Sequence, residues 1–313
     1  MKHDFIVTMA LIVFFILAQI VGLVLINADI NEIKVVDGVR TLVHGDTSLG
    51  PRPELSGSGT FLYIAIGLII GTLLLLLIIR MKKINLWKAW FFLAVFLAIS
   101  LSLGVFLNTL VAFILALALA ILKVTKPNVI IHNVTEVLMY SGIAIFLVPM
   151  LDITWAFILL IAISIYDMYA VWKSKHMVKM AKFQAKSQVF AGLFIPYTPK
   201  AQKLKEGKKA AALPKSFKAG VKSEKVQKGE RKNAVLGGGD IAFPLLFTGA
   251  VMEHLVVQGF TRVQALQQSL IITLTTTIAL AALFIFAKKD KFYPAMPFVT
   301  AGCLLGYGIV LLL

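Results

Sequence analysis

The chain has 313 residues, of which 59% are hydrophobic, and its formal net charge is +16. Soluble domains are about half apolar, whereas several runs in this chain reach the roughly 20 apolar residues that cross a bilayer. A soluble globular protein is therefore excluded and a polytopic membrane protein is indicated. Nucleic acid is not expected as a partner, because no basic stretch is interleaved with aromatic residues.

Nine apolar runs follow one another along the chain, and we expect each to be a transmembrane helix. Each run is continuous rather than alternating, and a helix satisfies its own backbone hydrogen bonds in lipid. The first run is too long for the apolar part of a signal peptide and lacks a small-residue cleavage site after it, so it is interpreted as a retained helix. The predicted fold is all-α, with spans at 5–27, 60–79, 89–107, 109–122, 134–151, 153–172, 235–257, 263–287 and 292–313.

Two segments lie outside these spans and divide the chain. The N-terminal membrane part, 1–172, holds spans one to six and a loop at 28–59, in which Asp37-Gly38 between two β-branched runs predicts a hairpin. The segment 173–234 is rich in Lys, Ala and Gly and is expected to be partly disordered. Spans seven to nine form the C-terminal part, 235–313.

The segment 173–234 contains one apolar patch, Val189 to Tyr197, that allows two interpretations. The patch can dock on the membrane domain, or it can belong to a solvated tail that is attracted to anionic lipid. The solvated tail is the preferred interpretation. The small-xxx-small patterns Gly67–Gly71 and Gly302–Gly306 predict close helix packing.

Lys and Arg are distributed unevenly between the two sides of these spans. With the N-terminus inside, 27 of the 31 basic residues fall in cytoplasmic segments and four fall outside. The segment 173–234 alone holds 17 of them, and long loops are weak evidence for topology, but without it the distribution is still 10 to four. The positive-inside rule therefore predicts a multi-pass cell-membrane protein with its N-terminus and the 173–234 loop in the cytoplasm and its C-terminus outside.

Two carboxylates lie inside the predicted spans, where an ionisable residue is costly and is functional by default. Asp167 is six residues before Lys173, where the sixth span ends, and Asp240 is five or six residues into the seventh. At about 1.5 Å per residue, both lie roughly 8–9 Å below the inner boundary, so they can face each other from consecutive antiparallel helices. The alternative for an isolated Asp is a packing role. Glu136 is placed at a helix start near the inner face.

A pair of close carboxylates supplies acid–base chemistry without any other group. In a site of low dielectric constant the two do not ionise together readily and tend to share one proton. The ionised member can deprotonate a water while the protonated member donates to a carbonyl oxygen, as in aspartic proteases. Five scattered histidines and one cysteine offer no metal-ligand cluster and no nucleophile–histidine arrangement. We therefore expect no cofactor and no metal.

Three short motifs occur in order on the sixth, seventh and ninth spans. They are Tyr166-Asp167, the G-x-G-D pattern Gly237-Gly238-Gly239-Asp240, and Pro294-Ala295-Met296. In number of spans and order of motifs, the whole membrane domain resembles the presenilin and signal peptide peptidase family of intramembrane aspartyl proteases, in a prokaryotic or archaeal form. The family's third motif is usually Pro-Ala-Leu. Methionine is apolar and close to leucine in volume, so we expect Met296 to keep the role.

The resemblance implies that Asp167 and Asp240 are the catalytic pair of an intramembrane endopeptidase. It implies that Tyr166 shapes the substrate site, with ordinary helix packing as the alternative. The glycines Gly237 to Gly239 would let backbone approach closely, and Pro294 to Met296 would begin the ninth span irregularly beside the site.

The partners implied by this resemblance are the bilayer and transmembrane-helix proteins. A substrate helix must unwind before its amides can be cleaved, and the exposed strand can pair with free backbone near the glycines or near Pro294–Pro297. The charge distribution favours the presenilin-like orientation, hence substrates with the N-terminus outside. An oligomer, the natural substrate and cleavage of the 173–234 loop itself stay open.

Two other classes fit part of the pattern. A proton- or cation-coupled transporter or channel also uses paired intramembrane aspartates, although no inverted repeat is evident. A prepilin-type peptidase also carries G-x-G-D, but there a basic residue typically follows two positions after the aspartate. Here Ile241-Ala242 follow, which favours burial.

Overall fold

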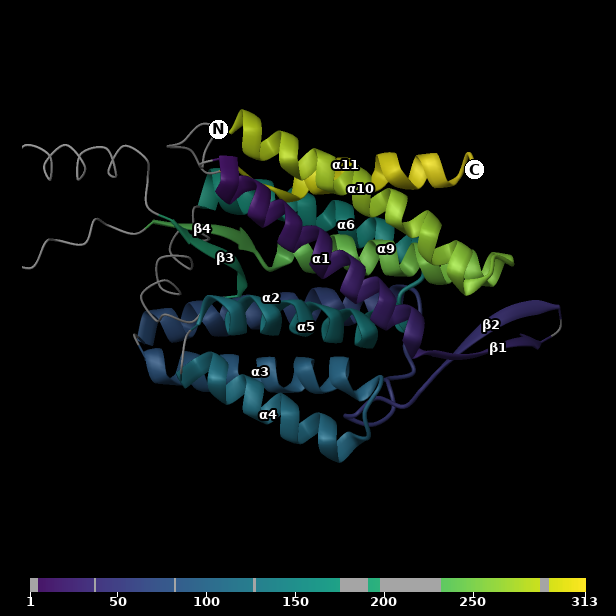
Figure 1. Ribbon diagram of the computed structural model, residues 1–313, viewed down its shortest axis with the longest axis horizontal. Helices are drawn as coiled ribbons and strands as arrows, with labels where there is room; N and C mark the ends of the chain where they lie inside the picture. The colour runs from purple at the N-terminus through teal and green to yellow at the C-terminus, as the bar shows by residue number, and fades with distance from the viewer. Residues whose placement is uncertain are drawn as a thin grey trace, which may run out of the picture.

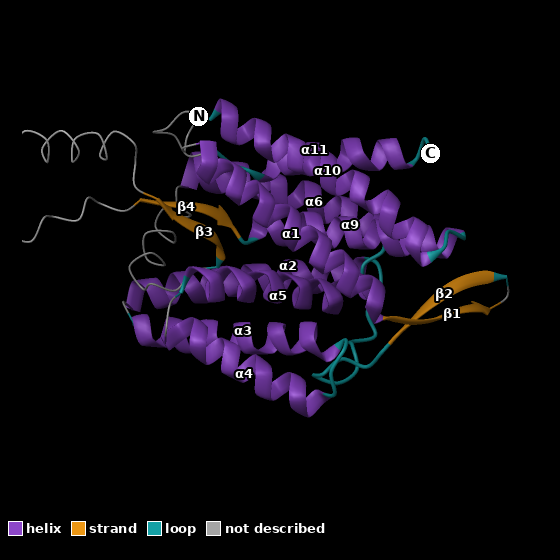
Figure 2. Cartoon of the chain, in the orientation of Figure 1, coloured by secondary structure: helices purple, strands orange, loops and turns teal. Residues whose placement is uncertain are grey.

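α-Helices make up most of the chain in the computed structural model, which describes residues 5–36, 38–81, 83–125, 128–174, 191–197, 232–287 and 293–313 (Figures 1 and 2). Those ranges contain nine α-helices. In chain order they are α1 (Phe5–Asp29), α2 (Ser58–Met81), α3 (Ile84–Gly104), α4 (Thr109–Thr125), α5 (Val129–Leu147), α6 (Ile153–Tyr169), α9 (Gly239–Gln258), α10 (Arg262–Phe286) and α11 (Met296–Val310).

The helices match the predicted apolar runs one for one, within a few residues at most ends. Seven of them are long and apolar enough to cross a membrane, while α4 has 17 residues and α11 has 15. The chain is therefore a multi-pass membrane protein, as predicted. Polar side chains cap the starts of two helices. The Asp152 side chain accepts from the Trp155 N–H at the start of α6, and Thr261 with Gln264 forms a capping box at the start of α10.

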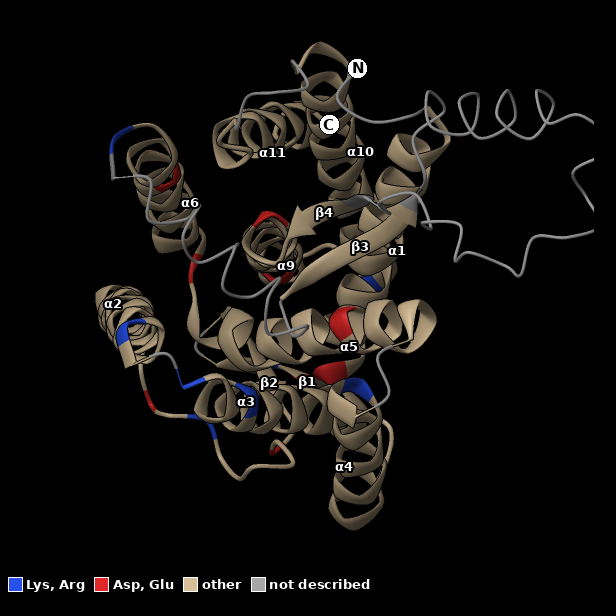
Figure 3. Cartoon of the chain, turned by 90° about the vertical axis from the view of Figure 1, so that its left-hand side faces the viewer, with Lys and Arg blue, Asp and Glu red and all other residues tan. Residues whose placement is uncertain are grey.

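Helix α9 occupies the centre of the bundle, and α2 stands at its edge (Figure 3). α9 contacts α1, α5, α6, α10 and α11, and most of its side chains are buried. α2 contacts α3 and α6, and few of its side chains are buried. The element that carries Asp240 thus lies where water and lipid are most excluded.

The two small-xxx-small patterns have different outcomes. A Cβ on Gly302 would lie 2.6 Å from the Thr276 Cα, and one on Gly306 would lie 2.6 Å from the Ile272 Cα, so α11 and α10 pack backbone to backbone as predicted. The prediction for α2 is wrong, because nothing lies within 4 Å of a Cβ on Gly67 or Gly71.

Two β-hairpins lie at opposite ends of the bundle (Figure 1). The predicted hairpin is present as β1 (Ile30–Val36) and β2 (Val39–His44), and Gly38 in its turn has φ +79°. It is fixed to the helices by charged groups. The His44 Nε2 lies 3.0 Å from the Glu253 Oε1 of α9. In the loop that follows, Arg52 donates to the Asp29 Oδ2 at 2.6 Å.

The second hairpin corrects two predictions. Strand β3 (Gly192–Tyr197) pairs with β4 (Lys232–Gly237) in an antiparallel sheet. The seventh span therefore does not begin at Val235: that residue is in a strand, and the helix starts at Gly239. The preferred interpretation of the apolar patch is also wrong for its C-terminal part, because β3 packs on α5 and α1 with Leu193 fully buried. The rest of the 173–234 segment lies largely outside the described residues.

Candidate active site

Helices α6, α9 and α11 each contact the other two, with α9 in the centre and α6 and α11 beside it (Figure 3). The end of α6 lies against the start of α11. Asp167 lies in the last turn of α6, after which the helix widens into a π-helical turn, Ala170–Ser174. Asp240 is the second residue of α9, and Pro294 to Met296 lead into α11. The three predicted motifs are therefore brought together.

Asp167 is buried and receives hydrogen bonds from backbone. The Met296 N–H donates to its Oδ2 at 3.1 Å, and the Ala295 N–H donates to the same carboxylate. Both donors come from the start of α11, where the first N–H groups of a helix have no partner within the helix. The third motif thus acts through its main chain, while the Met296 side chain is buried in the core.

Asp240 and Asp167 interact electrostatically across the contact between α9 and α6. Asp240 is partly exposed and receives a hydrogen bond from the Gly237 N–H. A Cβ on Gly237 would lie 3.2 Å from the Asp240 Oδ2, which is a tight contact. The glycine run therefore supplies both a donor and the space that the carboxylate occupies.

The other two glycines have side chains rather than backbone as their nearest neighbours. A Cβ on Gly238 would lie 2.5 Å from the Tyr140 hydroxyl oxygen and 3.0 Å from the ring carbon Cε1. At Gly239 the nearest atom would be 3.4 Å away, on the Phe243 ring, which is ordinary contact. The close approach expected across this run is thus greatest at Gly238, against the buried ring of Tyr140.

The position of Asp240 along the bundle depends on β4 and α1. An extended strand advances about 3.3 Å per residue, more than twice the rise of a helix, so β4 carries the chain further into the bundle before Asp240. The Gln19 side chain, at the fifteenth of the 25 residues of α1, donates to the Ile241 carbonyl at 2.9 Å. Asp240 consequently lies beside the middle of α1.

Tyr166 has a different environment from its neighbour Asp167. Its side chain is 43% exposed, so it does not pack in the core of the bundle. That position is compatible with a surface that a substrate touches and argues against ordinary interior packing.

Several residues around the site were not singled out from the sequence. Gln19 is a polar side chain within an apolar run, a signal that could have identified it. The carboxylate of Glu136, assigned to a helix start, is instead fully buried and paired with Lys123. The sequence alone does not mark four further residues as part of the site, because their contacts depend on the packing of β3 against α5. They are Gly192, Tyr140, His132 and Asn133.

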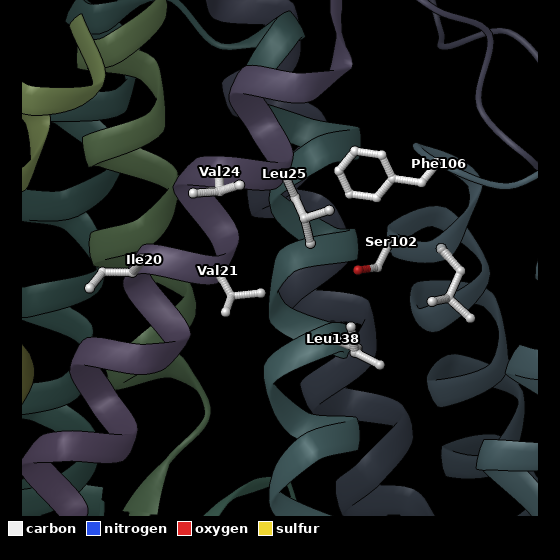
Figure 4. A pocket seen from close by; sticks show the side chains of 8 residues that line it. Ile20, Val21, Val24, Leu25, Ser102, Phe106 and Leu138 are labelled. Carbon is white, nitrogen blue, oxygen red and sulfur yellow. The ribbon is translucent and has the colours of Figure 1, made fainter. Parts of the chain in front are cut away.

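An apolar cavity of about 320 Å³ lies elsewhere in the bundle, between α1, α3 and α5 (Figure 4). Its walls are aliphatic and aromatic apart from Ser102, whose hydroxyl has no hydrogen-bond partner among the described residues. None of the residues that line this cavity is acidic.

Comparison with known proteins identifies the chain. A family model described as signal-peptide peptidase, presenilin aspartyl protease matches residues 30–313. Two structures of a presenilin family intramembrane aspartate protease share the fold. One, in space group C222, has a TM-score of 0.55 and 16% identity, with 96% of this chain and 94% of that chain covered. The other, in space group P2, has a TM-score of 0.58 and 17% identity, with 97% and 96% covered. A comparison with curated proteins gave no match.

The fold and these matches define the protein as an intramembrane aspartic endopeptidase. Since the family model covers most of its length, the chain belongs to the signal-peptide peptidase and presenilin family of aspartyl proteases.

Proposed function

We propose that Asp167 and Asp240 are the catalytic pair that hydrolyses peptide bonds within transmembrane segments. The observation that carries this proposal is the electrostatic contact of two carboxylates held on separate helices, of which Asp167 is buried and Asp240 is partly exposed. Each is oriented by backbone N–H donors rather than by a neutralising cation. If one water can lie between two such groups, they have the composition of an aspartic protease site.

In the proposed reaction the pair shares one proton and holds a water between its carboxylates. The ionised carboxylate takes a proton from the water, whose oxygen forms a bond to the scissile carbonyl carbon. The protonated carboxyl gives its proton to the carbonyl oxygen, which produces a neutral gem-diol. The carboxyl that took the proton from the water then gives it to the amide nitrogen, while the other carboxylate takes a proton from one gem-diol hydroxyl. The C–N bond breaks, and an amine and a carboxylic acid are released. The pair ends with the same number of protons as it began.

We infer that an unwound substrate pairs with the outer edge of β4. β3 occupies one edge of β4, and no second strand lies beside it in the described sheet. Gly192 and Phe194 direct their backbone groups toward α5, so the β3–β4 hydrogen bonds fall at the alternate pairs, Leu193 with Leu236 and Ile195 with Ala234. Val235, two residues before Gly237, then directs its N–H and C=O away from β3. A substrate strand paired with Val235 would lead directly to the aspartates.

The substrate surface in this proposal also includes Tyr166, Gly237 to Gly239, and Pro294 to Met296. Tyr166 is the exposed member of this set, and the Pro294 segment binds Asp167 through its main chain. Substrates are transmembrane helices with the N-terminus outside, because the proposed topology has nine spans with the N-terminus and the 173–234 loop in the cytoplasm.

This topology makes a labelling prediction. A cysteine at the exposed Thr41 in hairpin β1–β2 (Thr41→Cys) should react with a membrane-impermeant maleimide on intact cells. Ser223→Cys in the 173–234 loop should react only after the cells are permeabilised. Cys303, the single native thiol, is buried and gives a low background. Labelling of Ser223→Cys but not Thr41→Cys on intact cells would reverse the orientation.

The test of the proposed activity uses the purified full chain in liposomes together with a single-span peptide. We expect two products whose new termini, read by mass spectrometry, lie within the span. The same vesicles loaded with a pH-sensitive dye report proton flux, which a transporter predicts and a protease does not. Proton flux without peptide products would reject the protease and favour the transporter, which the family match argues against.

A further inference from the structure

A cluster of buried polar side chains on α4 and α5 lies outside the aspartate pair. We name it the α5 polar cluster, and its members are Lys123, His132, Asn133, Glu136 and Tyr140. The Lys123 Nζ lies 2.5 Å from the Glu136 Oε1 and donates to the Thr135 Oγ1 at 3.0 Å. Glu136 and Tyr140 are nine-tenths or more buried. Taking such a charged pair out of water is costly and seldom adds net stability over apolar packing.

The cluster is organised around strand β3. The Glu136 Oε2 accepts from the Gly192 N–H at 2.8 Å, and the His132 Nε2 lies 2.8 Å from the Gly192 carbonyl oxygen. Because that oxygen can only accept, the His132 ring donates. Two residues further along β3, the Asn133 side chain accepts from the Phe194 N–H at 3.1 Å and donates to the Phe194 carbonyl at 3.0 Å. The side chains of α5 therefore take the place of a neighbouring strand.

This arrangement fixes the position of β3 along its length. The two backbone groups of Gly192 and the two of Phe194 are all matched to α5, so a slip of β3 by one residue would break four hydrogen bonds. Gly192 has φ +148°, and a Cβ there would collide with the Leu236 carbonyl oxygen. No L-residue adopts this conformation readily, which keeps β3 close against β4.

The position of β3 is transmitted to the aspartates through β4. Gly192 is the register partner of Gly237, and the Gly237 N–H is a donor to Asp240. A second link runs through Tyr140: its hydroxyl donates to the Glu136 Oε2, and its ring lies against Gly238. The Glu136 carboxylate thus binds both β3 and the Tyr140 hydroxyl. The glycine run lies between β3 and the Tyr140 ring.

We propose that Glu136 is a positioning residue for the aspartate pair, and that the α5 polar cluster sets the register in which the substrate bond is presented. This inference rests on the proposed function of Asp167 and Asp240. Glu136 does not touch the reacting atoms. It acts through β3, β4 and Tyr140, so its loss displaces Asp240 relative to Asp167 and loosens the strand on which the substrate aligns.

The test replaces Glu136 with glutamine, which keeps the shape of the side chain and removes its charge. A displacement of about 1 Å at reacting groups costs about 100-fold in rate, so we expect kcat to fall by about 10- to 100-fold with KM little changed. We also expect cleavage at several neighbouring bonds where the wild type cuts at one. A role limited to stability would not move the cleavage positions, which mass spectrometry reads directly.

Two further variants make the test decisive. Asn133→Leu keeps the Lys123–Glu136 pair and removes two bonds to β3, so it should also spread the cleavage positions even where Glu136→Gln folds poorly. Glu253→Gln is the matched control, because Glu253 is a buried acid on α9 paired with His44 in the exterior hairpin. It should leave kcat and the cleavage position unchanged.

The inference is overturned if Glu136→Gln and Asn133→Leu both cut the wild-type bond at the wild-type kcat, or if Glu253→Gln spreads the cleavage positions equally. Failure of the proposed function has a different signature. In that case the wild type releases no product, or Asp167→Asn retains its activity, whatever the Glu136 variants do.

Discussion

Replacing either Asp167 or Asp240 with asparagine is expected to lower the rate of intramembrane cleavage by about 10²- to 10⁴-fold, the contribution of one acid–base group. Asparagine preserves volume and can still accept from the N–H groups of Met296 or Gly237. It can neither take a proton from water nor pass one to a carbonyl. The measurement is the rate of product formation from a single-span peptide in liposomes at saturating substrate.

Each half of the pair needs the other, so the double variant should be little slower than either single variant. Asp152→Asn is the matched control: Asp152 caps the opposite end of α6 from an exposed position, and asparagine caps a helix as well as aspartate does. It should cut at the wild-type rate. Substantial activity in Asp167→Asn or Asp240→Asn would mean that the pair does not activate the water.

Replacing Gly238 with alanine is expected to lower the rate by about 100-fold, because a shift of about 1 Å at reacting groups has that effect. The added methyl would lie 2.5 Å from the Tyr140 hydroxyl oxygen. Tyr140 is buried and hydrogen-bonded to Glu136, so it cannot turn away without breaking that bond. The strain therefore moves the start of α9, and Asp240 with it. Cleavage kinetics with a folded, reconstituted variant measure the loss.

Gly239→Ala is the control within the same motif, since its methyl would meet only the Phe243 ring at ordinary contact distance. Alanine also favours a helix over glycine, so this variant should lose much less of the rate than Gly238→Ala. Equal losses at Gly238 and Gly239 would show that the motif needs glycine for backbone flexibility rather than for space beside Tyr140.

Much of this fold is encoded locally and was predictable. An apolar run in lipid has few alternatives to a helix, and Asp37-Gly38 between β-branched residues specifies a two-residue turn. β4 was not predictable in this way. Its sequence, Lys232 to Gly237, continues into the apolar run of α9, and only pairing with β3, more than 30 residues earlier in the chain, makes it a strand.

The site divides along the same line. Asp167 and Asp240 were identifiable because a carboxylate in an apolar span is conspicuous on its own. Their proximity in the structure agrees with the predicted pairing, although 232–237 is a strand and the helix starts only at Gly239. Gly238 could be recognised as part of a motif, but not its contact with Tyr140. That contact depends on the crossing of α5 and α9, which no single segment encodes.

The hydrogen bonds that the Ala295 and Met296 N–H groups donate to Asp167 link the charge of this carboxylate to the packing of α11. Hydrogen bonds to an ionised acceptor are roughly twice as strong as those to a neutral one. The beginning of α11 is therefore bound most strongly while Asp167 is deprotonated. Protonation of the Asp167 carboxylate weakens these two hydrogen bonds. If Asp167 gains and loses a proton in each catalytic cycle, the hydrogen bonds that hold the start of α11 would weaken and strengthen once per turnover. The mobility of α11 would then report the protonation state of Asp167.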